Sequence, residues 1–206
     1  DNWELCIVDG RSEKSHVKMV LEEYAKKDTR IKVSFLSKNK GIAGNSNEAL
    51  SMASGEFVAF LDHDDELAPF ALYEVVKLLN ENPNLDYVYS DEDKIDETGA
   101  RHDPFFKPDW SPDMFLSCNY LCHLSMIRKR LVDEVGGFRS EYDGSQDYDL
   151  FLRVTERIGE DGIGHIPKIL YHWRTAQEST ASSCEAKSYA YQGAIKSLED
   201  AMMRRE

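Results

Sequence analysis

The sequence predicts an α/β fold with a mostly parallel central sheet, helices on both faces and a smaller antiparallel portion. Two observations support this prediction. Strand-like and helix-like stretches alternate through the first ninety residues, and one strand-like run, 57–61, is entirely apolar. Such alternation is typical of parallel strands that are buried on both faces. We expect one domain over residues 1–206, with halves at 1–93 and 94–182 and a closing helix within 183–206.

The first half contains the clearest strand and helix signals. In the segment 13–27, Val17, Val20, Leu21 and Tyr24 recur at helical spacing. Glycine or proline stands at the ends of the other helical stretches, as is usual where helices begin or end. The strands are predicted at 3–9, 31–36, 56–62 and 85–93, and the helices at 13–27, within 41–55 and at 69–83.

The pattern changes after residue 93. Residues 94–113 are polar and proline-rich around a Thr-Gly turn, which suggests a hairpin or a long excursion. Ser145 is the candidate N-cap of a helix at 145–159. The remaining predicted elements are a short strand and a short helix within 123–138, a strand at 164–174 and a final helix at 183–203.

Composition and charge exclude several classes of protein. A net charge of −13 and a pI near 4.9 argue against a nucleic-acid-binding protein, which usually needs a positive surface. No run reaches the roughly 18 apolar residues of a membrane span, and the start lacks a signal peptide pattern. Four cysteines, Cys6, Cys118, Cys122 and Cys184, fit reduced thiols and a cytoplasmic location. Zinc ligation by Cys118, Cys122 and His123 lacks the second ligand pair of structural zinc sites.

An acidic cluster follows the apolar strand. Asp62, Asp64 and Asp65 fall at its carboxyl end, the edge where open α/β sheets bind ligands. The cluster could simply stabilise the N-terminus of the next helix. A calcium loop of the EF-hand type is excluded, because Leu67 and Tyr73 occupy its required glycine and glutamate positions. The third explanation is a divalent cation bound together with an anionic diphosphate.

Five segments of the chain resemble a known family. "WELCIVDG", "NKGIAGNSNEAL", "SGEFVAFLDHDD", "SQDYDLFLR" and "YHWR" occur in the order found in family 2 glycosyltransferases of GT-A fold. These bacterial enzymes transfer a sugar from a nucleotide diphosphate to an acceptor with inversion. The resemblance covers residues 2 to about 174. Each segment alone is a weak signal, whereas the ordered set is specific.

The resemblance implies a donor site around the acidic cluster. Asp62 and Asp64 match the family's Asp-x-Asp motif for ribose and for a divalent cation, Mn²⁺ or Mg²⁺. Asp64 is the first expected metal ligand and Asp65 the second. His172 matches a histidine that completes the metal shell, although it could equally be a packed strand residue. Asp91 is an expected contact of the donor sugar, and Asp93 shares that possibility.

The resemblance also implies a catalytic base and an acceptor site. Asp147 matches the base that takes a proton from the acceptor hydroxyl, and Asp149 could fill the same role. Gln146, beside it, stands where the family often has glutamate and is expected to contact the acceptor. Trp110 and Trp173 are expected aromatic platforms for sugar rings, and a core position for Trp110 is an equal alternative.

Nucleotide contacts are implied for the first half of the chain. Asp9 ends the first strand at the nucleotide-base position, and the "NKGIAGN" segment supplies further contacts. The family's second aspartate is Gly10 here, and its common arginine is Ser46, so the base preference is open. The expected nucleotide-sugar contacts are Asp9, Lys40, Gly41, Asn47, Asp62, Asp64 and Asp91.

The function that the resemblance implies is metal-dependent, inverting sugar transfer in bacterial surface polysaccharide synthesis. The donor would be a UDP- or dTDP-type sugar, and the acceptor a saccharide or a lipid-linked saccharide. The short basic stretches 127–131 and 202–206 leave peripheral association with the inner membrane face as one alternative, and an ordinary solvated helix is the preferred interpretation of so short a basic face. The family begins one strand and one helix earlier, so we expect a fragment or a degenerate member. The rival hypotheses are a domain that binds without turnover and a sugar nucleotidyltransferase.

Overall fold

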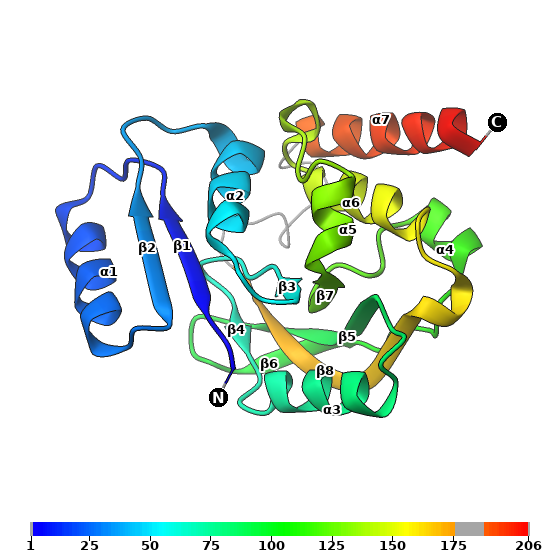
Figure 1. Cartoon of the computed structure of the whole chain (residues 1–206), viewed down its shortest axis with the longest axis horizontal. Helices are drawn as coiled ribbons and strands as arrows, with labels where there is room; N and C mark the ends of the chain where they lie inside the picture. Colours follow the sequence, from blue (N-terminus) through cyan, green and yellow to red (C-terminus); the bar gives the residue numbers. More distant parts are fainter. Residues whose placement is uncertain (1, 176–187, 206) are drawn as a thin grey trace.

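The computed structural model describes residues 2–175 and 188–205 (Figure 1). Its strands are β1 (Leu5–Asp9), β2 (Ile31–Phe35), β3 (Phe57–Ala59), β4 (Glu66–Leu67), β5 (Tyr87–Ile95), β6 (Arg101–Phe105), β7 (Ser125–Arg128) and β8 (Ile163–Arg174). Its α-helices are α1 (Ser15–Lys27), α2 (Gly41–Met52), α3 (Ala71–Glu81), α4 (Pro112–Ser117), α5 (Lys129–Glu134), α6 (Gln146–Thr155) and α7 (Ser188–Arg205). Two 3₁₀ turns are η1 (Ser140–Tyr142) and η2 (Glu160–Gly162). The order of strands and helices confirms the predicted α/β class.

The main sheet has six strands and mixed pairing. Its order is β3-β7-β5-β8-β4, and β6 pairs with the second half of β5. Within it only β5 and β8 are parallel, so the expectation of a mostly parallel sheet is wrong for this sheet. The connections explain the difference. A parallel neighbour needs a crossover of a dozen or more residues, whereas only residues 96–100 join β5 to β6.

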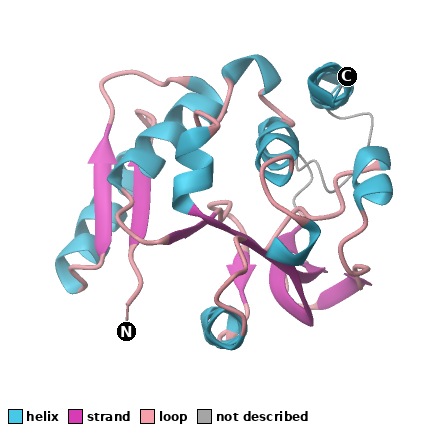
Figure 2. Cartoon of the chain, turned by 45° about the vertical axis from the view of Figure 1, so that its right-hand side comes forward, coloured by secondary structure: helices cyan, strands magenta, loops and turns pink. Residues whose placement is uncertain are grey.

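Strands β1 and β2 form a separate parallel pair, with α1 and α2 beside it (Figures 1 and 2). In the part of the chain that the structure describes, no strand ladder joins this pair to the six-stranded sheet. The connection is made instead by side chains. Glu4 Oε1 accepts the backbone N–H of Gly55 at 3.0 Å, just before β3.

Helices cover both faces of the main sheet, as predicted. Alternate residues of β5 serve two clusters of buried apolar side chains, so that Tyr87 and Tyr89 belong to one cluster and Val88 to the other. The first cluster packs under α4, α5 and α6, and the second packs under α3 (Figure 1). β5 is therefore the buried centre of the fold.

The strand before the acidic cluster is shorter and more open than predicted. β3 has three residues, of which Val58 alone is buried. Ala59 is exposed, and Leu61 is 42% exposed, so burial on both faces is the wrong prediction here. The reason is topological. β3 is the edge strand of the six-stranded sheet and pairs only with β7.

The second half follows the prediction with local differences. The β5–β6 pair confirms the hairpin, and α4 begins at its far end, where no helix was expected. Ser145 occupies the N-cap position of α6, but its hydroxyl donates to the carbonyl of Ala190 at 2.6 Å instead of capping the helix. The final helix is described from Ser188 on, and Cys184 lies outside the described residues. No described helix is long and apolar enough to cross a bilayer.

Candidate active site

The acidic loop 62–65 is held in place by β8. The Tyr171 hydroxyl donates to Oδ2 of Asp65 at 2.5 Å and accepts the backbone N–H of Asp62 at 3.2 Å. The backbone N–H of Arg174 donates to Oδ1 of Asp65 at 2.8 Å, and its guanidinium donates to the carbonyl of Asp64 at 2.7 Å. Burial raises the pKa of Asp65, and these hydrogen bonds only partly oppose the rise. Asp65 therefore supports the loop, and its metal-ligand role stays a prediction.

Asp62 and Asp64 have a different environment. Both residues are exposed at the surface of the loop, with the Asp62 side chain 59% exposed. Oδ2 of Asp62 lies 3.8 Å from Nε2 of His123. The two carboxylates of the predicted Asp-x-Asp motif are thus open to a ligand, while Asp65 fixes the backbone beneath them.

Asp147 lies close to this loop. Its position in the first turn of α6 brings it near His123 and Asp62. Burial raises the pKa of Asp147, the charge of His123 lowers it, and the charge of Asp62 raises it further. Nδ2 of Asn119 donates to its Oδ2 at 3.0 Å. The loop between α4 and β7 therefore contacts the predicted base through Asn119 and the predicted donor motif through His123.

Asp149 has a structural role. Its side chain is fully buried, and Arg153 donates to its Oδ2 from Nε at 3.0 Å and from Nη2 at 2.7 Å. The guanidinium of Arg139 bonds both of its oxygens. Because two arginines form ion pairs with the Asp149 carboxylate, the structure favours Asp147 of the two candidate bases.

His172 is fixed by a carboxylate. Its Nδ1 lies 2.5 Å from Oδ1 of Asp93, and Nε of Arg101 donates to the other Asp93 oxygen at 2.5 Å. Histidines that bind metals usually have one ring nitrogen held in this way. His172 stands between Tyr171 and Arg174, whose contacts hold the acidic loop, and it pairs with Glu66 of β4. This arrangement fits the predicted ligand role and assigns Asp93 to support.

The donor groups fit a cation that is bound jointly with a ligand. Among the described residues, no group of three or more histidine, cysteine, aspartate or glutamate side chains is arranged to hold a metal ion. This finding gives no support to zinc at Cys118, Cys122 and His123. Mg²⁺ and Mn²⁺ are commonly held by one or two carboxylates and by phosphate oxygens. The exposed carboxylates of Asp62 and Asp64 match that type of site.

The predicted nucleotide contacts lie around β1 and α2. Asp9 is buried at the end of β1, where its Oδ1 accepts the backbone N–H of Ser12 at 3.0 Å and the Ser12 hydroxyl at 2.5 Å. Gly41 opens α2 with a φ of 80°, which favours glycine. Lys40 is exposed and pairs with Glu48. Asp9, Lys40 and Gly41 remain predicted nucleotide contacts.

Asn47 and Asp91 make internal contacts. Asn47 joins α2 to the loop before α6, because its amide donates to the carbonyl of Phe138 at 2.8 Å and accepts the N–H of Phe138 at 2.9 Å. Oδ1 of Asp91 lies 2.9 Å from Nε2 of His165 and accepts the backbone N–H of Lys107 at 2.9 Å. The structure gives both residues supporting roles, and their contact with a nucleotide sugar stays untested.

Two predicted acceptor contacts also have internal partners. Trp110 is half-buried against the ring of Phe115, with 5.5 Å between the ring centroids, and packs on the main core. This favours the core alternative for Trp110. Gln146 lies one residue before Asp147, and its side-chain oxygen accepts the backbone N–H of Gly144 at 2.7 Å. Its position beside the candidate base is as predicted, while its contact with an acceptor stays a prediction.

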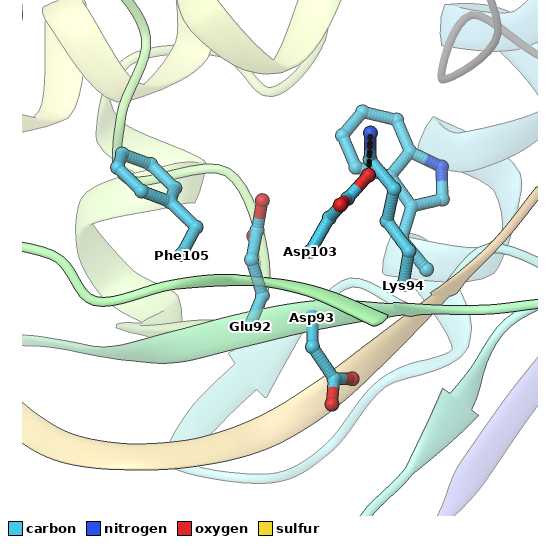
Figure 3. Close-up of a pocket in the computed structure, with 6 residues that line it drawn as sticks. Glu92, Asp93, Lys94, Asp103 and Phe105 are labelled. Carbon is cyan, nitrogen blue, oxygen red and sulfur yellow. Dashed lines mark hydrogen bonds and ion pairs between the residues drawn. The ribbon is translucent and has the colours of Figure 1, made fainter. Parts of the chain in front are cut away.

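Trp173 lines a pocket of about 240 Å³ (Figure 3). Glu92, Lys94, Asp103 and Phe105 lie on one side of the β5–β6 hairpin, and Asp93 points to the other side. Lys94 and Asp103 pair across the pocket at 3.4 Å. Because Trp173 and Tyr171 are two residues apart on β8, they lie on the same face of the sheet. The pocket therefore lies on the face of β8 that also carries Tyr171.

Sequence reasoning missed several residues of this site. Asn119 and His123 reach Asp147 and Asp62 from the loop between α4 and β7. His123 stacks on Tyr171 with 4.6 Å between ring centroids, and its Nδ1 is buried without a hydrogen-bond partner among the described residues. The sequence shows only that an asparagine and a histidine lie in one loop. Their contacts with Asp147 and Asp62 become visible only when the distant strands are paired in the fold.

Comparisons with known proteins agree with the geometry. The chain matches glycosyl transferase family 2 over residues 1–136. The O-antigen biosynthesis protein RfbC of Myxococcus xanthus is 37% identical over 98% of this chain and 16% of its own length. An S. aureus TarS fragment, solved in complex with UDP-GlcNAc, has a TM-score of 0.74 at 22% identity over 97% of this chain and 57% of that one. GalNAc-T7, solved with UDP, GalNAc and Mn²⁺, has a TM-score of 0.66 at 16% identity, over 95% of this chain and 41% of that one.

The two kinds of comparison show different things. The structural matches establish the GT-A fold, and one of those neighbours was solved with a nucleotide sugar and another with a metal. The chain spans less than a quarter of the length of the first curated relatives that it matches. The family match, by contrast, covers well over half of the chain. On that evidence, the chain belongs to glycosyl transferase family 2.

Proposed function

We propose that this domain transfers a sugar from a nucleotide-diphosphate sugar to a saccharide or lipid-linked acceptor, with inversion, in the synthesis of a bacterial surface polysaccharide. The observation that carries the proposal is that one loop between α4 and β7 contacts both Asp62, through His123, and Asp147, through Asn119. One carboxylate belongs to the family's donor motif, and the other is the expected base. The similarity to an O-antigen biosynthesis protein supports the polysaccharide assignment.

On the donor side, the exposed Asp62 and Asp64 carboxylates would bind the ribose and the cation. His172, fixed by Asp93, would be a further ligand. When bound, Mn²⁺ or Mg²⁺ supplies Lewis-acid stabilisation of the departing diphosphate. The cation also offsets the repulsion between a diphosphate and this acidic chain. Structural likeness to a protein solved with UDP-GlcNAc favours a UDP-type donor over a dTDP-type donor.

On the acceptor side, Asp147 would take the proton of the attacking hydroxyl. Burial raises its pKa, which makes the carboxylate a stronger base than an exposed aspartate. General-base assistance of this kind contributes typically about 10² to 10⁴ in rate. Displacement from the face opposite the diphosphate inverts the anomeric carbon.

The pocket in Figure 3 is the proposed acceptor subsite. Phe105 and Trp173 offer aromatic faces, while Lys94, Asp103 and Glu92 offer charged groups that hydrogen-bond hydroxyls. This combination suits a saccharide ring, which has apolar faces and a polar edge. The pocket is open to solvent and shares a face of β8 with Tyr171, so a chain end could enter it.

Association with a membrane surface remains part of the proposal. The basic side chains expected to carry it are paired with acids: Arg130 with Asp86 and Glu134, and Arg204 with Glu156. Pairing reduces their attraction for anionic lipids. A cytoplasmic enzyme that meets its acceptor without tight membrane binding is therefore the preferred form.

The test is release of nucleotide from a panel of UDP- and dTDP-sugars, with Mn²⁺, Mg²⁺ or a chelator, together with thermal shift to report binding. We expect release that requires both the cation and a saccharide acceptor, and that Asp147→Asn abolishes while binding persists. The matched control is Asp161→Asn, at an exposed site in η2. A thermal shift with no release under any condition would favour binding without turnover, and pyrophosphate formation from nucleoside triphosphates would favour a nucleotidyltransferase.

A further inference from the structure

One side-chain amide holds the carboxylate of Asp147, which also interacts with the backbone N–H groups of Asp147 and Tyr148 at the start of α6. Nδ2 of Asn119 donates to Oδ2 of Asp147 at 3.0 Å. Within residues 2–175 and 188–205, this is the one side-chain hydrogen bond that the Asp147 carboxylate receives. The bond leaves Oδ1 as the oxygen with no side-chain donor among those residues.

Asn119 is itself oriented by its own loop. Its backbone carbonyl accepts the thiol of Cys122 at 2.9 Å, and its Oδ1 accepts the backbone N–H of Cys122 at 3.5 Å. The oxygen of the amide thus faces the loop, and the NH₂ group faces the carboxylate. This orientation is the one that complements an ionised Asp147, because a carboxylate accepts hydrogen bonds and donates none.

A buried lysine fixes this loop to the sheet. The Lys107 side chain is fully buried, and its ammonium donates to Oε2 of Glu92 at 2.9 Å and to the carbonyls of Leu121 and His123 at 2.7 and 2.6 Å. Three acceptors satisfy all three ammonium hydrogens. The loop 118–124 therefore has a defined position relative to β5, and so does Asn119.

We propose that Asn119 is a positioning residue for the base: its amide holds Oδ2 of Asp147 so that Oδ1 is presented to the acceptor hydroxyl. The inference rests on the proposed function, in which Asp147 is that base. A carboxylate that is held on one oxygen is already oriented before the reaction, so no reorientation adds to the barrier. An N–H donor also favours the ionised carboxylate, which opposes the effect of burial.

The test uses Asn119→Asp and Asn119→Ala. Aspartate keeps the size of the side chain and its loop-facing oxygen, but replaces the donor with a like charge. We expect kcat to fall at least tenfold and the KM for the donor to change by less than twofold. The acidic limb of the kcat/KM profile should move to higher pH, because Asp147 becomes harder to ionise. Alanine should give a smaller shift in the same direction.

A second readout needs no turnover. The pKa of the Asp147 carboxyl is measured by ¹³C NMR titration of the free protein, with its signal assigned by its loss in Asp147→Asn. Both Asn119 variants should raise this pKa. The control is Asn80→Asp, which makes the same change of charge at an exposed position of α3 and should leave it unmoved.

The outcomes separate this inference from the proposed function. If Asp147→Asn abolishes turnover while neither Asn119 variant changes the pH profile or the carboxyl pKa, the positioning role is wrong and the base stands. If Asp147→Asn keeps full turnover, the base assignment fails, and the positioning role fails with it. Where turnover is undetectable, an unchanged carboxyl pKa in both variants is sufficient to overturn the inference.

Discussion

The hydroxyl of Tyr171 connects two points of the acidic loop, donating to Oδ2 of Asp65 and accepting the backbone N–H of Asp62. The ring of Tyr171 also stacks on His123, which faces Asp62. One buried side chain of β8 thus supports both the loop that carries the donor motif and the histidine that lies between this motif and the base. Its hydroxyl and its ring act on different neighbours, so they can be separated by substitution.

Tyr171→Phe is expected to weaken donor binding while keeping the fold. The variant removes two hydrogen bonds of the loop but retains the ring that stacks on His123. Two bonds at about 1 kcal/mol each total about 2 kcal/mol, so the Kd of the nucleotide sugar should rise by up to roughly thirtyfold. Isothermal titration with Mn²⁺ measures it. Tyr73→Phe, at an exposed ring of α3, is the control, and equal affinities for all three proteins would contradict the role of Tyr171.

Asp149→Asn should destabilise the protein strongly. The fully buried carboxylate stands between Arg139 and Arg153, and its loss leaves the Arg153 guanidinium without its counter-charge and Arg139 with Asp200 as its remaining partner. Breaking a buried pair typically costs about 3–5 kcal/mol, measured here as the free energy of unfolding in urea. The comparison is Asp133→Asn, which breaks the surface pair with Lys129 and should cost less than about 1 kcal/mol. Similar losses for the two variants would show that Asp149 has no special structural role.

Asp147→Asn is expected to stabilise the protein at neutral pH. Burial raises the pKa of Asp147 in the folded protein above its unfolded value, so its favourable contribution is present below about pH 4 and is lost as the pH rises through the folded pKa. Asparagine stays neutral throughout. At pH 7 the Tm should therefore rise, as measured by thermal unfolding. The gain should vanish below pH 4, and a pH-independent difference would contradict this explanation.

Trp173→Ala should act on the acceptor alone. Loss of one aromatic wall of the pocket in Figure 3 should raise the KM for a saccharide acceptor about tenfold, which corresponds to about 1.4 kcal/mol. The Kd of the donor should stay within twofold, because no residue of the acidic loop lines the pocket. Steady-state kinetics with each substrate varied in turn separates the two effects. A change confined to the donor would place Trp173 in the donor site instead.

Local sequence signals predicted most of the strands and helices. The helical spacing of Val17, Val20 and Tyr24 and the proline that follows α3 have direct structural counterparts. The strand pairing was less predictable. Spacing along the chain does not reveal that β8 inserts between β4 and β5, and this insertion brings Tyr171 under the acidic loop.

The site was predicted unevenly for a related reason. Asp62 and Asp147 could be chosen because each belongs to a short motif, and the structure brings them together. Asn119, His123 and Lys107 belong to no motif, so only tertiary contacts reveal them. Conversely, the sequence could not show that Asp149 forms ion pairs with two arginines or that Asn47 is hydrogen-bonded to the backbone of Phe138.

The separation of the β1–β2 pair from the six-stranded sheet has an evolutionary consequence. Asp62, Asp147, Asn119 and Tyr171 all depend on the larger sheet or on segments packed on it, whereas Asp9 depends on β1. Because no described ladder joins the two, substitutions around Asp9, the proposed nucleotide contact, should alter nucleotide preference without disturbing Asp62 and Asp147, the carboxylates proposed for the transfer. A domain built in this way could acquire new donors by changing one small sheet while its chemistry stays intact.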